Sequence, residues 1–205
     1  MSNLSKSYRK FAGATVTASA VALVVAPLAS AASFTDVAPQ YKEAVDFLLS
    51  KGAEGFNEKQ FGIDKEITRV DAAILLAKVL ELDVSSTSPS EFTDVPKRGI
   101  PYVNALKKAG ITEGKTETAF GSYDLITRGE LAIWIHQGFN LKDGKDLAYT
   151  DVAPQYKEAV SALVEGKITA GTSAATFGTE QNAKRGDFAV FLHKADKVKI
   201  TPEHN

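Results

Sequence analysis

The stretch from Ile126 to Ala132, Ile-Thr-Arg-Gly-Glu-Leu-Ala, has two further copies in this chain of 205 residues. The first copy runs from Ile67 to Ala73 and the third from Ala183 to Ala189. Their arginines stand at positions 69, 128 and 185, so the copies are 59 and 57 residues apart. Each copy has an arginine, one spacer, an acidic residue and an apolar run. This pattern indicates a threefold internal repeat.

Each copy is typical of the start of a helix. Thr68 and Thr127 can accept a backbone N–H of the first turn. Asp71 and Glu130 follow three residues later, as in a capping box. One interpretation makes the acids caps and the arginines solvated. However, a cation at this end opposes the helix dipole by about 0.3–1 kcal/mol, and beside free first-turn N–H groups it forms an anion site. The sequence leaves both interpretations open.

The first 31 residues are typical of a secretory signal peptide. Three basic residues precede an apolar segment from Phe11 to Leu28, and residues 29–31, Ala-Ser-Ala, form a cleavage signal. The apolar segment is too short and polar for a membrane anchor. We predict cleavage before Ala32 and no membrane contact afterwards. The remaining 174 residues equal three repeats of 58.

The composition excludes some functions. Without the signal peptide the chain has 21 Lys and Arg against 25 Asp and Glu, a net charge of −4. This balance does not favour nucleic acid or an anionic membrane as a partner. The chain has no cysteine, so its stability must come from a hydrophobic core.

Two more patterns recur in every repeat. An aromatic-Thr-Asp-Val element with a nearby proline predicts an extended entry, an aspartate cap and a short amphipathic helix. A Phe-Gly pair seven residues before each motif arginine predicts an irregular loop anchored by the phenylalanine. Glycines 52, 110 and 166 are expected to end the short helices. The aromatic-Thr-Asp-Val elements occupy residues 34–37, 92–95 and 149–152, and the Phe-Gly pairs occupy residues 61–62, 120–121 and 177–178.

Together these elements resemble the S-layer homology (SLH) domain, over nearly all of the mature chain. The resemblance implies a mainly α fold, with three SLH repeats in a pseudo-threefold arrangement and three prongs around a central helical bundle. The expected divisions are a signal peptide at 1–31, repeats at 32–91, 92–148 and 149–199, and a tail at 200–205.

The resemblance also implies a function. Grooves between the prongs would bind a secondary cell-wall polysaccharide, linked to peptidoglycan and carrying pyruvate ketals, at the cell wall or S-layer of a Gram-positive bacterium. The motif arginines would bind the ketal carboxylate and the motif acids would brace them or bind sugar hydroxyls. The expected ligand-binding residues are Arg69, Arg128, Arg185, Asp71, Glu130, Asp187, Tyr123 and Lys184.

The third repeat departs from the pattern, because Lys184 replaces the threonine cap and leaves its helix start less certain. We therefore expect Arg69 or Arg128 to dominate binding, with Lys184 adding positive charge beside Arg185. Tyr123 could face a sugar, and Trp134 is expected in the core. Glycine at positions 129 and 186 lowers helix propensity by about 1 kcal/mol each.

The expected function is non-enzymatic anchoring, and the alternatives are a lattice subunit of an S-layer, or a fragment of one, and an unrecognised hydrolase. No G-x-S-x-G, H-E-x-x-H or P-loop motif occurs. The histidines do not cluster in the sequence. We therefore expect no catalytic residue, metal or cofactor.

Overall fold

A computed structural model describes residues 34–145 and 147–200. The predicted signal peptide and the end of the tail lie outside the described residues. The described part of the chain is mainly helical, as predicted, and its strand pairing is limited to isolated bridges. The helices are α1 (Pro39–Ser50), α2 (Arg69–Val79), α3 (Ile100–Lys108), α4 (Arg128–Phe139), α5 (Lys157–Glu165, after the 3-10 turn η1, Pro154–Tyr156) and α6 (Arg185–Ile200).

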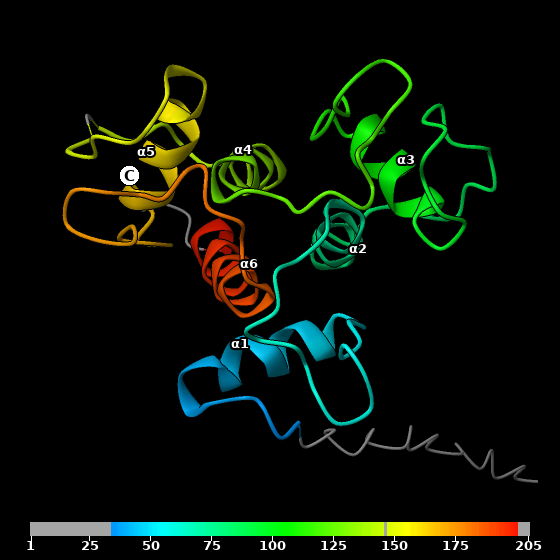
Figure 1. The fold of residues 1–205 in the computed structure, drawn as a ribbon, viewed down its shortest axis with the longest axis horizontal. Helices are drawn as coiled ribbons and strands as arrows, with labels where there is room; N and C mark the ends of the chain where they lie inside the picture. The colour runs from blue at the N-terminus through cyan, green and yellow to red at the C-terminus, as the bar shows by residue number, and fades with distance from the viewer. Residues whose placement is uncertain (1–33, 146, 201–205) are drawn as a thin grey trace, which may run out of the picture. The chain divides into compact units, whose positions relative to one another are not determined.

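Three helices form the centre and three lie around them (Figure 1). The central helices α2, α4 and α6 each begin at a motif arginine. The outer helices do not pack on the central helix of their own repeat. Instead α3 packs on α2, α5 packs on α4, and α1 packs on α6. Each outer helix therefore covers the preceding repeat's central helix, and the first repeat closes the cycle on the third.

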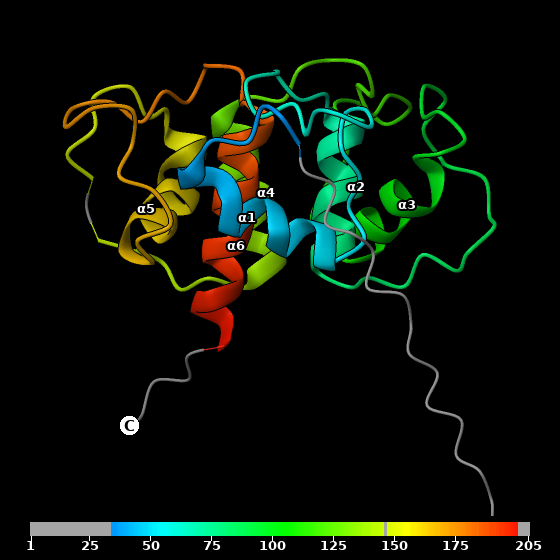
Figure 2. The same ribbon diagram turned by 90° about the horizontal axis from the view of Figure 1, so that it is seen from below.

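A closed ring of hydrogen bonds ties the three repeats together ahead of the central helices. The N–H of Ile126 donates to the carbonyl of Ile67 at 3.1 Å, Ala183 donates to Ile126 at 2.9 Å, and Ile67 donates to Ala183 at 3.0 Å. All three residues are buried. Figure 2 shows the loops that carry this ring gathered at one end of the central helices. The ring gives the described unit its pseudo-threefold axis.

Threonine caps form as predicted, but the third repeat does not need one. The hydroxyl oxygens of Thr68 and Thr127 accept the N–H groups of Asp71 and Glu130, and Glu130 completes a capping box. The third helix still begins at the equivalent Arg185. Backbone carbonyls of the first repeat accept its first two N–H groups, and equivalent contacts between repeats begin the two capped helices.

The aspartates of the aromatic-Thr-Asp-Val elements are not helix caps, and that prediction is wrong. The helix α1 starts after Ala38 and has no side-chain cap. The carboxylate of Asp36 instead accepts the N–H groups of Phe61, Gly62 and Ile63 at 2.7–3.2 Å. The equivalent carboxylates, Asp94 and Asp151, bind the Phe-Gly N–H groups of their own repeats. These bonds fold each glycine loop back onto the start of its repeat.

The loops and helix ends follow the glycine pattern with one exception. Phe61, Phe120 and Phe177 are fully buried, which confirms them as loop anchors. Gly52 and Gly110 follow their helices with positive φ. In the third repeat Gly166 is the C-cap residue of α5 and has a negative φ of −69°. The next residue, Lys167, takes the left-handed conformation with φ 54°.

The glycines inside the motif make room for tyrosines of the outer segments. A Cβ on Gly129 would lie 3.0 Å from the ring of Tyr156, and one on Gly186 would lie 3.1 Å from the ring of Tyr41. At the third equivalent contact the large and small residues are exchanged. Val70 stands at the position of the motif glycine and packs on Gly99, which stands at the position of the tyrosine. Close packing between repeats therefore requires glycine at these two positions, although glycine has a low helix propensity.

Candidate functional site

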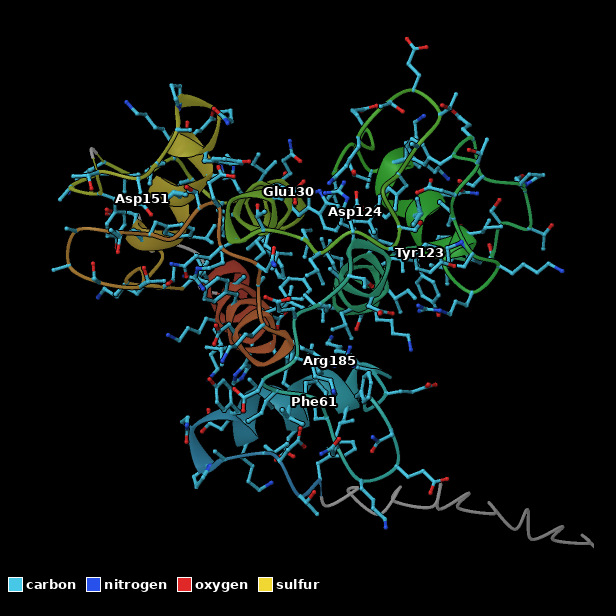
Figure 3. The ribbon with its side chains drawn as sticks, viewed as in Figure 1. Phe61, Tyr123, Asp124, Glu130, Asp151 and Arg185 are labelled. Atoms are coloured by element: carbon cyan, nitrogen blue, oxygen red, sulfur yellow. The ribbon has the colours of Figure 1, made fainter. Side chains whose placement is uncertain are left out.

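The three motif arginines are not solvated. Arg69 and Arg128 are 3% and 6% exposed, and Arg185 is half-buried. Each guanidinium lies over the phenylalanine of the next Phe-Gly loop in the cycle, with its carbon 4.7–5.2 Å from the ring centroid. Figure 3 shows Arg185 beside Phe61. Burial lowers the pKa of all three arginines, although nearby carboxylates oppose this effect. They remain cations at neutral pH, because the guanidinium of arginine is not deprotonated in proteins.

The helix N-termini are closed to an anion. The N–H of Arg69 donates to the carbonyl of Asp124 at 2.9 Å, and that of Val70 donates to Ser122 at 3.1 Å. Arg128 and Arg185 begin their helices with equivalent bonds to other repeats. The expectation of free first-turn N–H groups is therefore wrong, because loop carbonyls of the neighbouring repeat occupy them. An anion can meet only the guanidinium groups.

Two of the three arginines are already paired with a motif acid of the next repeat. Arg69 donates to Glu130 at 2.7 Å, and Arg128 lies 3.8 Å from Asp187. Asp187 also accepts a hydrogen bond from the hydroxyl of Tyr41 at 3.4 Å. The motif acids thus contact arginines, but each pair joins two different repeats, and the sequence does not predict this pairing.

Arg185 is bound differently. The equivalent acid, Asp71, is paired with Arg98 at 2.6 Å. Among the described residues no carboxylate lies within 4 Å of the Arg185 guanidinium, which donates to the carbonyl of Glu54. Its Nε is buried and has no hydrogen-bond partner. Arg185 therefore keeps unused hydrogen-bonding capacity.

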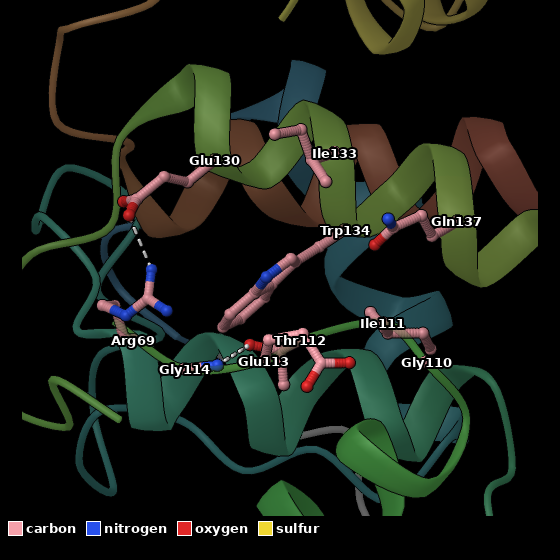
Figure 4. Close-up of a pocket in the computed structure, with 10 residues that line it drawn as sticks. All are labelled: Arg69, Gly110, Ile111, Thr112, Glu113, Gly114, Glu130, Ile133, Trp134 and Gln137. Atoms are coloured by element: carbon pink, nitrogen blue, oxygen red, sulfur yellow. Dashed lines mark hydrogen bonds and ion pairs between the residues drawn. The ribbon is translucent and has the colours of Figure 1, made fainter. Parts of the chain in front are cut away.

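One pocket, called here the Arg69 groove, lies between α4 and the second repeat's glycine loop. Its volume is about 270 Å³. Figure 4 shows Arg69 and Glu130 joined at one end, with the ring of Trp134 beside them. Trp134 is 4% exposed, so its predicted core position is confirmed. The residues lining the groove are Arg69, Gly110, Ile111, Thr112, Glu113, Gly114, Glu130, Ile133, Trp134 and Gln137.

A second pocket, called here the Arg185 groove, occupies the equivalent place along α2. Its volume is about 410 Å³, and α3 contributes a further wall. Asp71, Leu75 and Lys78 stand where the Arg69 groove has Glu130, Trp134 and Gln137. The residues lining it are Glu54, Gly55, Phe56, Asp71, Ile74, Leu75, Lys78, Arg98, Tyr102 and Arg185.

The two grooves differ in charge. The Arg69 groove has one cation, Arg69, and two acids, Glu113 and Glu130. The Arg185 groove has three cations and two acids. It also contains two rings, Tyr102 and the 58% exposed Phe56. An anionic ligand with an apolar face therefore fits the Arg185 groove better.

Four predicted site residues, Arg128, Asp187, Tyr123 and Lys184, lie outside the linings of both grooves. Tyr123 is 69% exposed in the loop before α4 (Figure 3). Lys184 is exposed and forms an ion pair with Asp64 at 3.1 Å. Conversely, no sequence pattern selects Arg98, Tyr102 or Phe56. Arg98 and Tyr102 reach this groove because α3 packs on the preceding repeat's helix α2.

Comparison with known proteins agrees with the geometry. The S-layer homology domain family matches residues 91–132 and 148–189. Two segments of this chain are thus similar to the S-layer homology domain. They cover the second and third of the three equivalent units in the structure.

The chain is also similar to several proteins named for a surface layer or a cell wall. The chain is 31% identical to an S-layer protein of Bacillus thuringiensis subsp. finitimus, over 93% of this chain and 25% of that protein. It is 31% identical to a surface-layer 125 kDa protein of Lysinibacillus sphaericus, over 95% of this chain and 18% of that protein. An uncharacterized cell wall amidase of Bacillus anthracis is 29% identical over 57% of this chain and 22% of its own length. The chain thus spans a quarter or less of the length of these relatives.

The described residues include no helix with the length and apolar character needed to cross a membrane.

Proposed function

We propose that this chain is a non-enzymatic anchoring module that binds the secondary polymer of a Gram-positive cell wall. The polymer would be a polysaccharide linked to peptidoglycan and carrying pyruvate ketals, and the protein would lie at the cell wall or S-layer. The two SLH matches and the relatives named as S-layer proteins support this role. The amidase match covers little more than half of the chain and so argues weakly for catalysis.

The proposal includes a third SLH domain in the first unit. Residues 34–79 supply an outer helix, a Phe-Gly loop and a central helix in the same order as the two matched segments. The hydrogen-bond ring treats Ile67 as the equivalent of Ile126 and Ala183. With only two domains the ring and the cycle of outer helices would stay open.

The Arg185 groove is the proposed main binding site, and the free capacity of Arg185 is the observation that carries this assignment. A pyruvate ketal presents a carboxylate, and a guanidinium can meet a carboxylate through two parallel N–H groups. In the described structure Arg185 has no carboxylate within 4 Å, because Asp71 is paired with Arg98, so an arriving carboxylate would not have to displace an ion pair. Arg98 and Lys78 add positive charge to the same groove.

This assignment revises the expected ranking of the arginines. Arg69 already donates to Glu130 and to the carbonyl of Phe120, so an arriving carboxylate would compete with an existing ion pair. We propose that the Arg69 groove, and the paired Arg128, bind more weakly. Their acids, Glu130 and Asp187, would hold the arginine and present oxygen atoms to sugar hydroxyls. Roles for Tyr123 and Lys184 stay predictions.

The proposed function is tested by sedimentation of the protein with purified cell walls, before and after chemical removal of the secondary polymer. We expect the protein to sediment with intact walls and to stay in solution with stripped walls. Lys42→Ala is a matched charge control, since Lys42 is 68% exposed and pairs with Asp46 on the surface of α1. Equal sedimentation with stripped walls would exclude polymer binding as the basis of anchoring.

A lattice subunit is the second candidate. The chain spans a quarter or less of the S-layer proteins it resembles, so the sequence can be the anchoring part of a longer, lattice-forming protein. Self-assembly of this chain into sheets in the absence of cell walls, seen by electron microscopy, would favour a lattice role for these residues themselves.

A further inference from the structure

His136 lies in a cluster of metal-ligating groups that is separate from both grooves. It is in the last turn of α4, and its Nε2 lies 3.2 Å from the carboxylate of Asp143 in the linker that follows. Glu158, in the first turn of α5, completes the cluster. One ligand atom from each residue lies within 4.8 Å of the others. We propose that these three residues bind a divalent transition-metal cation, with zinc as the best fit.

The ligand types select the metal. Zinc binds imidazole nitrogen and carboxylate oxygen at about 2.0–2.2 Å, which puts neighbouring ligand atoms roughly 3.3 Å apart in a tetrahedron. The separation of His136 and Asp143 already matches this value. The exposed Glu158 side chain has rotamers with which to close the remaining gap. Calcium and magnesium prefer sets made of oxygen alone, so the imidazole disfavours them.

The surroundings leave room for an ion and its water. A pocket of about 540 Å³ is lined by Asp143 and Glu158. Lys145 and Lys157 line this pocket as well. The His136 side chain is only 16% exposed, so packing restricts its movement on one side of the cluster. A bound divalent cation would balance the two carboxylate charges, and water would fill the fourth position.

The pseudo-symmetry provides an internal comparison. His193 occupies the same position in α6, eight residues after its motif arginine. Its ring stacks on Phe47 with centroids 5.0 Å apart. Within the described residues the three-ligand cluster includes His136 and not His193. The histidines do not cluster with each other, as the sequence indicates, but the fold brings carboxylates from two other segments to one of them.

The site would fasten the linker between the second and third units. Asp143 is the linker's ligand, and the next N–H, that of Gly144, donates to the hydroxyl oxygen of Ser161 on α5 at 3.2 Å. A Cβ on Gly144 would overlap the backbone at Ser161, so the linker already lies against α5. A cation would join α4, this linker and α5, and should therefore raise the melting temperature of the folded chain.

The test is calorimetric titration of the full chain with zinc chloride, with calcium and magnesium chloride as parallel titrations. We expect one zinc site per chain, weakened by about tenfold or more in His136→Ala and in Glu158→Gln. His193→Ala and His204→Ala are the matched controls and should bind zinc like the parent. Zinc should raise the melting temperature of the parent and of both controls, and not that of His136→Ala.

Glu158→Gln keeps the test valid if His136→Ala folds poorly, because Glu158 is exposed. The proposal is overturned if zinc up to about 1 mM gives no saturable binding. It is also overturned if Glu158→Gln and His136→Ala bind as tightly as the parent, or if calcium binds more tightly than zinc.

Discussion

The guanidinium of Arg69 donates to the carboxylate of Glu130 at 2.7 Å, and this contact joins the first repeat to the second. The side chains are 4% and 24% exposed. Arg69 also lies over the rings of Phe120 and Trp134. A residue that resembles an open anion receptor in the sequence is thus one half of a shielded ion pair between repeats.

Arg69→Ala is expected to reduce the free energy of unfolding by about 3 kcal/mol, near the lower end for removal of one partner of a buried pair. Glu130 is partly exposed and recovers some hydration, which limits the loss. The measurement is urea unfolding followed by circular dichroism. In Lys42→Ala, which breaks an exposed pair, the change should stay below about 1 kcal/mol. Similar losses in the two variants would contradict a structural role for Arg69.

Acid should destabilise the protein through Asp36, Asp94 and Asp151. Partial burial alone raises the pKa of these carboxyls, but the backbone N–H donors of the Phe-Gly loops outweigh it and hold each pKa below its usual value. A carboxyl with a lower pKa in the folded state stabilises it above the unfolded pKa of about 3.9. This stability is lost as the pH falls through the folded pKa.

The melting temperature should therefore drop steeply below about pH 4 in the parent. The drop should be shallower in a variant with all three aspartates changed to asparagine, which is less stable at pH 7 but has lost these titrating groups. Parallel curves for the two proteins between pH 7 and pH 2.5 (roughly the range around the carboxyl pKa values) would show that the three carboxylates do not govern acid stability.

The fit between Gly129 and Tyr156 predicts a size exchange. Gly129→Val should cost about 1–3 kcal/mol of stability by overpacking, although valine is the better helix former. Adding Tyr156→Gly should recover part of that loss, because the pair then copies Val70 and Gly99. A double-mutant cycle in urea measures the coupling. Strictly additive effects would mean that the two residues do not share one packing site.

A single repeat should not fold alone. In residues 92–148 the helix α3 loses its partner α2, and α4 loses α5 and α6. The hydrogen-bond ring is also opened at Ile126. We expect this fragment to show weak helical circular dichroism and no cooperative melting, while the three-repeat chain melts cooperatively. A cooperative transition in the isolated fragment would contradict the cyclic packing.

Much of the fold was accessible from the sequence, because helix starts and loop anchors are local. Thr127 and Glu130 form the predicted capping box, and Phe120 anchors its loop as expected. The site was less accessible, because its partners lie in other repeats. The pairing of Asp71 with Arg98 leaves Arg185 free, and the packing of α3 on α2 brings Arg98 there. Both contacts join residues of different repeats, and no spacing within the sequence predicts them.

The affinity of Arg185→Ala for the isolated wall polymer, measured by calorimetry after its folding is checked by circular dichroism, tests the central proposal most directly. A charge-assisted hydrogen bond is worth about 1.5–3 kcal/mol, so binding should weaken by roughly tenfold to a hundredfold. Arg185→Lys should recover only part of this loss, since an ammonium cannot make the two parallel bonds, and Lys42→Ala should bind like the parent. Parental affinity in folded Arg185→Ala would contradict the account.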